Sequence, residues 1–303
     1  MLANSLNLPK PFVDAVSEKH VRSDTRYSVT ETLGGTCEAV LRRRHAEDID
    51  DDVADRVWAI LGTAVHKVLQ ESDAEPWQER EQYIKVPIDG TRFELSGIFD
   101  MYDKRERRVT DWKTCSVWKT QVGDFEDWRK QLEAYCWMLE RSGEEAREGE
   151  IVAIMRDHSM RKARFEKGYP PHPVMRIAWR FDDADMEDTG VRLKRWFLDL
   201  ADQLGRADED LVPCTPEERW SKPETWAVMR SGRKKAVRVY ESEKDARVRV
   251  MEENKKADSN DLYYVEFRKG EDTKCQSYCE VARWCPHGRK FFQDSENSQA
   301  SSD

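Results

Sequence analysis

Two carboxylates and a lysine lie close together near the middle of the chain. Asp100 is followed eleven residues later by Asp111, and Lys113 comes two residues after that. Residues i and i+2 of a strand project from the same face, so Asp111 and Lys113 are expected to point together, and a hairpin would bring Asp100 beside them. Such carboxylates suit Mg²⁺ or Mn²⁺, and the lysine can orient or deprotonate an attacking water and offset phosphate charge. A lone Asp-x-Lys, however, is more often a surface ion pair.

Polar residues on the flanking segments accompany this group. His66 lies on a predicted helix beside the small residues Ala59 and Gly62, which leave room for a metal ion or a strand. Gln131 and Tyr135 are four residues apart on a second predicted helix and therefore share a face. Each also has an ordinary explanation, as an exposed surface histidine and as an aromatic side chain that packs in the core.

The order of these motifs is more specific than any one of them. His, Gly-x-x-Asp, Asp-x-Lys and Gln-x-x-x-Tyr follow one another over residues 28–140. This order resembles the RecB-type branch of the PD-(D/E)XK nucleases, which includes the CRISPR-associated iron–sulfur exonucleases and the AddB nuclease domain. The resemblance implies metal ligands, a lysine that assists the attacking water, and a pair of residues that contacts substrate. It assigns these roles, in that order, to His66, Asp100 and Asp111, to Lys113, and to Gln131 and Tyr135.

Three of the seven cysteines are crowded into eleven residues near the C-terminus, at Cys275, Cys279 and Cys285. The odd number of cysteines and the absence of a signal peptide make a disulfide framework an unfavourable explanation. Thiolates are soft ligands that select zinc or iron–sulfur clusters. His287 lies close enough in the sequence to complete a zinc tetrahedron, so zinc stays an alternative.

The family resemblance favours a four-iron four-sulfur (4Fe-4S) cluster, with a fourth cysteine from far upstream. In the CRISPR-associated and AddB examples that residue precedes the first core helix, where Cys37 stands here. The stretch from Cys214 to Cys285 also resembles phage-encoded nucleases of the superfamily, in which the upstream cysteine is the expected ligand. We therefore predict Cys214, Cys275, Cys279 and Cys285 as ligands, with Cys37 as the alternative to Cys214. The cluster would mainly be structural, because ligation can supply folding free energy.

The elements that must position these residues follow from hydrophobic periodicity. Residues 51–71 have an apolar stripe at helical spacing, formed by Val57, Leu61, Ala64, Val65 and Val68. Residues 125–141 have a second stripe, formed by Trp128, Leu132, Tyr135, Cys136 and Leu139. Ser28 and Glu31 are typical of a helix start. A further helix is predicted over residues 185–204, and strands over 83–86, 93–102, 108–114, 151–156 and 174–180.

This succession predicts an α/β fold with a mixed central sheet flanked by helices, and the resemblance identifies it as a restriction-endonuclease-like core. We expect an extended N-terminal arm, because Pro9 and Pro11 interrupt a segment of little pattern. A C-terminal cysteine-ligated segment contains short predicted strands at 226–229, 236–240 and 262–267 and a charged helix from residue 241. The predicted divisions are the arm (1–25), nuclease core (26–210), cluster segment (211–290) and a low-complexity, disordered tail (291–303).

Composition limits the class of protein without identifying a substrate. The 303 residues carry a net charge of −9, which does not by itself indicate a nucleic-acid binder. Basic residues are clustered, however, at 42–45, 161–164 and 233–235, and each cluster has a solvated surface patch as its ordinary explanation. No apolar run approaches the roughly 18 residues of a membrane span. We expect a soluble protein of the bacterial or phage-infected host cytoplasm, with no membrane partner.

The function predicted from these patterns is a Mg²⁺- or Mn²⁺-dependent DNA exonuclease. Its partner would be DNA, as single strands or duplex ends, in phage or bacterial replication, recombination or end processing. Two alternatives stay open at this point. One is a DNA-binding or scaffold subunit without turnover, and the other is a nuclease that processes CRISPR spacers beside an integrase.

Overall fold

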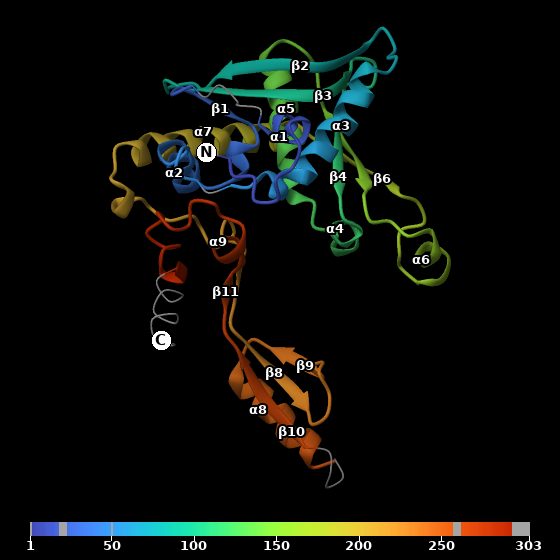
Figure 1. The fold of residues 1–303 in the computed structure, drawn as a ribbon, viewed down its shortest axis with the longest axis vertical. Coiled ribbons are helices and arrows are strands. Elements are labelled where there is room, and N and C mark those ends of the chain that lie inside the picture. The colour runs from blue at the N-terminus through green and yellow to red at the C-terminus, as the bar shows by residue number, and fades with distance from the viewer. Residues whose placement is uncertain (1, 18–22, 50, 257–261, 293–303) are drawn as a thin grey trace. The chain divides into compact units, whose positions relative to one another are not determined.

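The computed structural model describes residues 2–17, 23–49, 51–256 and 262–292 (Figure 1). Residues 293–303 of the predicted tail and residues 18–22 of the predicted arm therefore lie outside the described residues. The chain forms two compact units, Met1–Arg206 and Ala207–Asp303, and each is considered by itself. Among the helices that are described, none has both the length and the apolar character needed to cross a membrane.

A mixed sheet of six strands forms the centre of the first unit (Figure 1). β3 pairs antiparallel with β2 along one edge, and along its other edge it pairs first with β1, in parallel, and then with β4, antiparallel. β4 continues in parallel with β5, which pairs antiparallel with β6. The predicted α/β class with a mixed sheet is confirmed. The strands are β1 (Arg26–Ser28), β2 (Gln78–Pro87), β3 (Glu94–Asp103), β4 (Arg108–Cys115), β5 (Glu148–Met155) and β6 (Val174–Arg180).

β3 and β4 form a hairpin that is paired only near its turn. The last pair joins Met101 to Thr110, and beyond it the two strands separate. β1 occupies the edge of β3 that β4 leaves, while β4 pairs along its whole length with β5. Asp100 and Asp111 are the first residues beyond the last pair, one on each strand. The separation therefore opens the sheet at the two aspartates.

α5 (Glu126–Arg141) contacts β4 and β5 through its apolar stripe. All five residues of the predicted stripe are buried, as expected: Trp128, Leu132, Tyr135, Cys136 and Leu139. The helix approaches the sheet closely at Gly149 of β5, where an added Cβ would lie 2.9 Å from Cβ of Leu132 and 3.0 Å from a ring carbon of Phe181. A side chain at Gly149 would displace both neighbours from the core.

α3 (Val57–Glu71) is a helix, as predicted, but its apolar stripe is not part of the core. The structure describes α3 in full, and none of its residues is buried. Val68 is 65% exposed and Trp58 is 57% exposed. Periodicity identified the helix correctly, because the spacing of apolar residues follows from the helical repeat whether or not another element covers that face.

The N-terminal region contains more regular structure than the sequence predicts. A short helix, α1 (Lys10–Val16), replaces the expected extended arm. Pro11 stands in its first turn, where the missing amide is not required for helical hydrogen bonding. Ser28 and Glu31 exchange backbone-to-side-chain hydrogen bonds at 2.7 and 3.2 Å, as a helix start requires. They lead only into a 3-10 turn, and the α-helix begins later, at Thr36.

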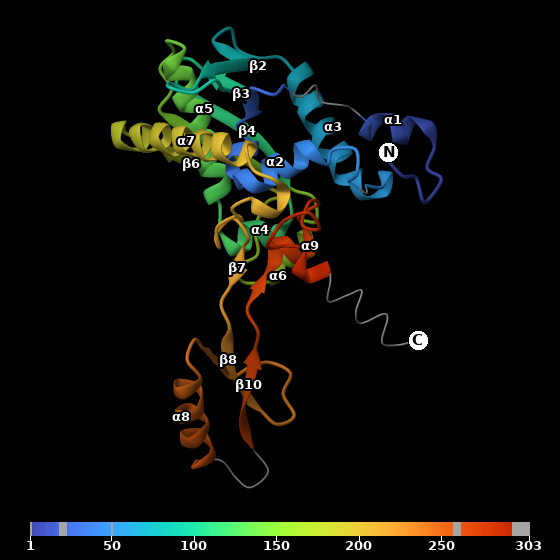
Figure 2. The same cartoon turned by 90° about the vertical axis from the view of Figure 1, so that its left-hand side faces the viewer.

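The other helices of this unit surround the sheet, and α7 lies beside α5 and α2 (Figure 2). α7 begins with a capping box in which Asp182 and Asp185 satisfy each other's backbone amides. Its Trp196 and Phe197 pack edge-on against Tyr27 of β1, which fixes the first strand to the body of the unit. These elements are η1 (Glu31–Leu33), α2 (Thr36–Arg44), η2 (Val53–Arg56), α4 (Val117–Val122), α6 (Met160–Phe165) and α7 (Asp183–Leu204).

The second unit contains a small antiparallel sheet in the order β10-β8-β9, and α8 packs against it. A two-residue ladder between β7 and β11 precedes α9, which contains Cys275. The predicted short strands and charged helix of this region are present. Its elements are η3 (Asp208–Asp210), β7 (Ser221–Lys222), β8 (Thr225–Arg230), β9 (Arg238–Tyr240), α8 (Glu243–Asn254), β10 (Tyr263–Arg268), β11 (Glu271–Asp272) and α9 (Thr273–Ser277).

Candidate active site

The two aspartates meet where β3 and β4 separate. Both are buried, with exposed fractions of 6% for Asp100 and 2% for Asp111. Oδ2 of Asp100 accepts a hydrogen bond of 2.6 Å from the backbone amide of Trp112 on β4. This bond holds the Asp100 carboxylate across the gap between the strands, next to Asp111.

Lys113 projects from the same face of β4 as Asp111, as the strand period predicts. Its Nζ lies 2.7 Å from Oδ2 of Asp111. The lysine side chain is partly exposed and the aspartate side chain is not, so the ammonium group stands between the buried carboxylate and the solvent. A positive charge is therefore placed at the mouth of an acidic site.

α5 supports the site from the buried side. Nε2 of Gln131 donates a hydrogen bond of 3.2 Å to Oδ1 of Asp111. The hydroxyl of Tyr135 donates to the backbone oxygen of Ile98 at 2.8 Å, and its ring occupies the space beside Gly97, where an added Cβ would lie 2.5 Å from a ring carbon. Gly97 therefore allows α5 to approach the strand that carries Asp100. The contacts of Gln131 and Tyr135 in the structure are with protein groups, and their predicted contact with substrate stays a prediction.

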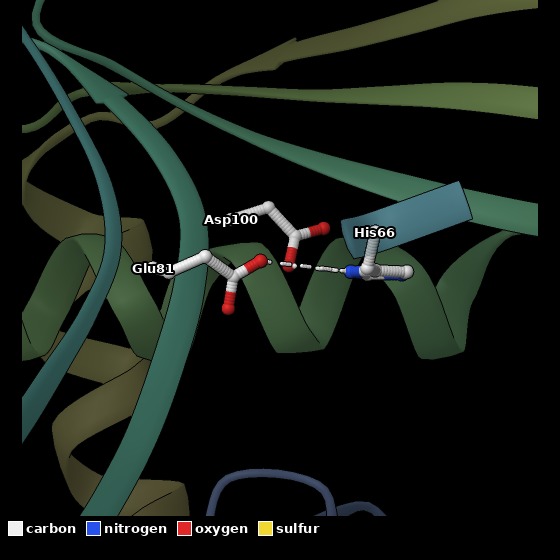
Figure 3. A group of neighbouring side chains, drawn as sticks. All are labelled: His66, Glu81 and Asp100. Atoms are coloured by element: carbon white, nitrogen blue, oxygen red, sulfur yellow. Dashed lines mark ion pairs between the residues drawn. The ribbon is translucent and has the colours of Figure 1, made fainter. Parts of the chain in front are cut away.

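α3 supplies the imidazole from the other side. Nδ1 of His66 lies 3.1 Å from Oδ1 of Asp100 and 3.9 Å from Oε1 of Glu81 (Figure 3). One ligand atom from each of His66, Glu81 and Asp100 lies within 4.8 Å of the others. His66 is partly exposed, with 34% of its side chain accessible, so this side of the site is open to solvent.

Glu81 was not identified from the sequence. Its neighbours Arg80 and Gln82 pair with Met101 and Phe99, which places Glu81 opposite Asp100 in the β2–β3 ladder. Glu81 has a positive φ of 48°, an unusual backbone conformation for this residue type, and it lies between the two flanking pairs. A hairpin register centred between residues 90 and 91, as in the observed ladder, would have placed Glu81 beside Asp100 before the structure was known.

The electrostatics of the site indicate an excess of negative charge. Burial raises the pKa of Asp111 to about 6, and the charge of Asp100 acts in the same direction, against the opposing charge of Lys113. Burial, followed by the charge of Asp100, also raises the pKa of Glu81. The hydrogen bond to Asp100 raises the pKa of His66. The charge of Asp100 therefore disfavours the ionised forms of Asp111 and Glu81 unless a cation lies among the carboxylates.

The donor set fits a divalent metal ion. Carboxylate oxygens are hard ligands suited to Mg²⁺ and Mn²⁺, and imidazole adds a nitrogen ligand. His66, Glu81 and Asp100 already converge, and Asp111 is close enough to Asp100 for the Asp100 charge to affect its ionisation. Asp111, Asp100 and Lys113 also satisfy the basic requirement for hydrolysis of a phosphodiester, a metal site with a cationic side chain beside it.

The four cysteines predicted as ligands all lie in the second unit. Cys275 and Cys285 are buried, and Cys214 and Cys279 are half-buried. Burial raises the pKa of the Cys275 thiol to about 12, and the negative charges of Cys279, Cys285, Asp272 and Cys214 act in the same direction. Cys214 is therefore close enough to Cys275 to affect its ionisation.

The two alternatives from the sequence have other surroundings. Cys37 is buried within α2 of the first unit, rather than in the unit that contains the C-terminal cysteines. Nε2 of His287, the residue considered for zinc, lies 2.6 Å from Oδ2 of Asp272. The remaining cysteines, Cys115 and Cys136, are both buried, next to the Asp-x-Lys and Gln-x-x-x-Tyr motifs in the sequence.

Comparison with known protein families identifies one that this sequence matches. The model of the PD-(D/E)XK nuclease superfamily matches residues 73–286, a range that contains every candidate residue except His66 and Cys37. No curated protein matches the sequence.

Solved structures match this chain at low sequence identity and with TM-scores below 0.5. The protein SSO0001 is 16% identical with a TM-score of 0.46, and the match covers 62% of this chain and 83% of that one. The alkaline exonuclease LHK-Exo from Laribacter hongkongensis is 10% identical with a TM-score of 0.36, covering 59% and 90%. A phage related exonuclease from Haemophilus somnus 129PT is 9% identical with a TM-score of 0.28, covering 56% and 74%.

Proposed function

This chain belongs to the PD-(D/E)XK nuclease superfamily, and we propose that it is a divalent-metal-dependent deoxyribonuclease that removes nucleotides from single-stranded DNA or duplex ends. The observation that supports this proposal most directly is the convergence of Asp100, Asp111 and Lys113 where β3 and β4 separate. Replication, recombination or end processing of phage or bacterial DNA is the setting in which we expect this activity.

The acidic residues would hold the metal ion. His66, Asp100 and Asp111 are the ligands implied by the family resemblance, and Glu81 is added here because it lies opposite Asp100 and beside His66. When bound, Mg²⁺ or Mn²⁺ would supply Lewis-acid chemistry at the scissile phosphate.

The other residues would position the reactants. Lys113 would orient the attacking water or accept its proton, and its charge would offset the charge that develops on the phosphate. Gln131 would hold the Asp111 carboxylate in its orientation through the amide hydrogen bond. Tyr135 would keep β3 in place through its bond to Ile98, and both α5 residues would contact the substrate near the reacting phosphate.

Substitution of Lys113 tests the assignment. We expect Lys113→Ala to lower the rate of DNA degradation in Mg²⁺ or Mn²⁺ by about 10²–10⁴-fold, the usual contribution of a positioned proton-transfer group. Asp111→Asn should remove activity to a similar or greater degree. Lys85→Ala is a matched control, because Lys85 is an exposed lysine on β2 that pairs with Glu94. Full activity of the Lys113 and Asp111 variants would contradict the proposal, and binding of DNA without degradation by the wild-type chain would favour a non-catalytic subunit.

We also propose that Cys214, Cys275, Cys279 and Cys285 hold a structural 4Fe-4S cluster. The proposal is supported by their common location in one unit and by the effect of Cys214 on the ionisation of Cys275. Ligation would require thiolates, and a raised thiol pKa means that a positively charged metal centre would have to stabilise them. Three thiolates from one short segment and a fourth from upstream are a donor set that fits such a cluster.

Spectroscopy and paired variants test the cluster. Protein purified without oxygen should be brown, with broad visible absorbance, labile sulfide and about four irons per chain, which is the composition that a single 4Fe-4S cluster requires. Cys214→Ser should lose this absorbance, and the matched variant Cys37→Ser should keep it. A colourless protein with one zinc ion and no labile sulfide would contradict the cluster. Loss of absorbance in Cys37→Ser, with absorbance kept in Cys214→Ser, would show that Cys37 is the fourth ligand instead of Cys214.

A further inference from the structure

A group of exposed aromatic and basic side chains lies at the ends of β4 and β5, where neither the proposed metal site nor the core uses it. Trp58 is 57% exposed, Trp118 is 69% exposed and Phe165 is 80% exposed. Figures 1 and 2 both show α4 and α6 at this end of the sheet, past the end of β4. We call this group the strand-end surface, and it consists of Trp58, Trp118, Arg156, Arg161, Arg164 and Phe165.

Specific contacts join the segments that carry Trp58, Trp118 and Arg156, and α6 follows the last of them along the chain. The guanidinium of Arg156 lies 4.5 Å from the centroid of the Trp58 ring, which connects α3 to the end of β5. The backbone amide of Arg156 donates to the carbonyl oxygen of Cys115 at 2.9 Å. The amide of Val117, next to Trp118, donates to Oδ1 of Asp157 at 2.7 Å. These bonds bring the first turn of α3, the start of α4 and the segment before α6 together.

The strand-end surface adjoins the candidate active site along two elements. Cys115 comes two residues after Lys113 on β4, a distance of about 7 Å along a strand. Trp58 precedes His66 by eight residues on α3, which is about 12 Å along a helix. Each nucleotide of an extended strand can span several ångströms, so a chain held at the metal site would reach this surface within a few nucleotides.

The segment that leads into and through α6 has a local excess of positive charge. Residues 156–169 contain five lysines and arginines and two acidic residues, in a chain whose net charge is −9. Arg161 and Arg164 are exposed, and within the part of the chain that the structure describes they form no ion pair. The basic cluster at the N-terminal side differs, because Arg42 pairs with Glu38 and Arg43 with Glu31. Of these two clusters, the one at residues 156–169 therefore has more positive charge available for an anionic partner.

We propose that the strand-end surface binds the single-stranded part of a DNA substrate next to the scissile phosphate, with bases stacked on Trp58 and Trp118 and phosphates paired with Arg156, Arg161 and Arg164. The inference rests on the proposed nuclease function and specifies its substrate class. Exposed aromatic rings interleaved with unpaired arginines are the features that bind single strands, because every base has a face for stacking. Duplex DNA fits less well, because its bases stay stacked on one another and cannot stack on the two tryptophan rings. An apolar protein partner also fits less well, because it would leave the arginines without counter-charges.

Binding measurements on the full chain test the proposal in the Asp111→Asn background, which prevents degradation. Fluorescence anisotropy with a labelled 20-nucleotide oligo-dT, in Ca²⁺ and at several salt concentrations, would give affinity and salt dependence. Trp58→Ala should weaken binding by about tenfold or more, as expected for loss of one stacked base, and Trp58→Phe should restore most of it. Arg161→Ala/Arg164→Ala should reduce the slope of log affinity against log salt by about 1.4, for two phosphate contacts on a single strand.

Controls separate this surface from general charge effects and from the nuclease assignment. Arg195→Ala removes an arginine on α7 that is 82% exposed and pairs with Asp199, and it should leave both affinity and salt slope unchanged. Wild-type affinity and slope in Trp58→Ala and in the double arginine variant would overturn the proposal. Equal losses of affinity for a blunt hairpin duplex in these variants would also overturn it. A change in sedimentation or thermal unfolding without a change in DNA affinity would overturn it as well, because it would indicate that another protein surface covers this face. Failure of the nuclease assignment shows separately, as absence of DNA degradation by the wild-type chain.

Discussion

Two helices flank the same pair of aspartates, and they are attached to the sheet in different ways. α5 buries its whole apolar stripe and reaches Asp111 with a buried amide, that of Gln131. None of the fifteen described residues of α3 is buried, and this helix reaches Asp100 through the half-buried imidazole of His66. Packing therefore determines the position of α5, whereas polar contacts contribute much of what holds α3 near the site. We infer that one wall of the site is rigid and that the other can adjust to metal and substrate.

Truncation of an apolar residue on each helix tests this difference most strongly. Leu132→Ala should lower the free energy of unfolding by about 2–5 kcal/mol, because Leu132 is fully buried against Gly149. Val68→Ala on α3 is the matched control and should change stability by less than about 0.5 kcal/mol. Urea unfolding of the metal-free protein followed by circular dichroism would measure both. Equal losses in the two variants would show that α3 is packed as firmly as α5.

The same contrast explains which features the sequence could predict. The stripe of α5 and the positions of β3 and β4 follow from local periodicity, and the structure contains them where they were expected. The burial of a stripe does not follow from periodicity, because it depends on which elements lie against the helix. The exposed stripe of α3 could therefore not be foreseen, and neither could the pairing of the three-residue strand β1 with β3.

The candidate site could be predicted where its residues follow a motif. His66, Asp100, Asp111 and Lys113 occur in an order that resembles a family, and the structure brings them together. Glu81 belongs to no such motif. Its place beside His66 depends on the register of β2 on β3, which is a long-range property of the sheet. The roles of these residues in catalysis stay predictions until the variants are measured.

Addition of a divalent cation should stabilise the two helices that flank the site, α3 and α5, to different degrees. A cation bound by His66, Glu81 and Asp100 would connect α3 to β2 and β3, so it should slow hydrogen exchange in α3. At a concentration of 100 times the dissociation constant, the free energy of local opening should rise by up to about 2.7 kcal/mol. Amides of α5 should change much less, because packing already protects them.

Mass spectrometry of hydrogen exchange with and without Mn²⁺ would measure this difference, and EDTA should reverse it. His66→Ala serves as the control, since it removes the ligand on α3 and leaves the carboxylates in place. Equal protection of α3 and α5 by the cation would contradict the idea of one adjustable wall. Retention of the full effect in His66→Ala would mean that α3 supplies no ligand.

The smallest expected effect is a dependence of α3 on pH in the metal-free protein. The hydrogen bond and the charge of Asp100 raise the pKa of His66 in the folded state, against the opposing effect of burial. The stabilisation from this pair is therefore fully present below the unfolded value of about 6.5 and is lost as the pH rises through the folded value. Because His66 is about one-third exposed, we expect only about 0.2–1 kcal/mol.

Hydrogen exchange of α3, corrected for the intrinsic pH dependence of amide exchange, would measure this loss between pH 6 and pH 9, the range that spans the ordinary histidine pKa and values raised above it. His66→Gln keeps a side chain of similar polarity without a titrating group, so it should remove the pH dependence while α5 behaves as in the wild type. Protection of α3 that increases with pH would have the wrong sign for a protonated His66 bound to Asp100.

Since a metal ion requires the neutral imidazole, the same titration should strengthen cation binding as it weakens the attachment of metal-free α3. Opposite pH trends in the presence and absence of Mn²⁺ are therefore the most specific evidence that one residue, His66, controls the adjustable wall.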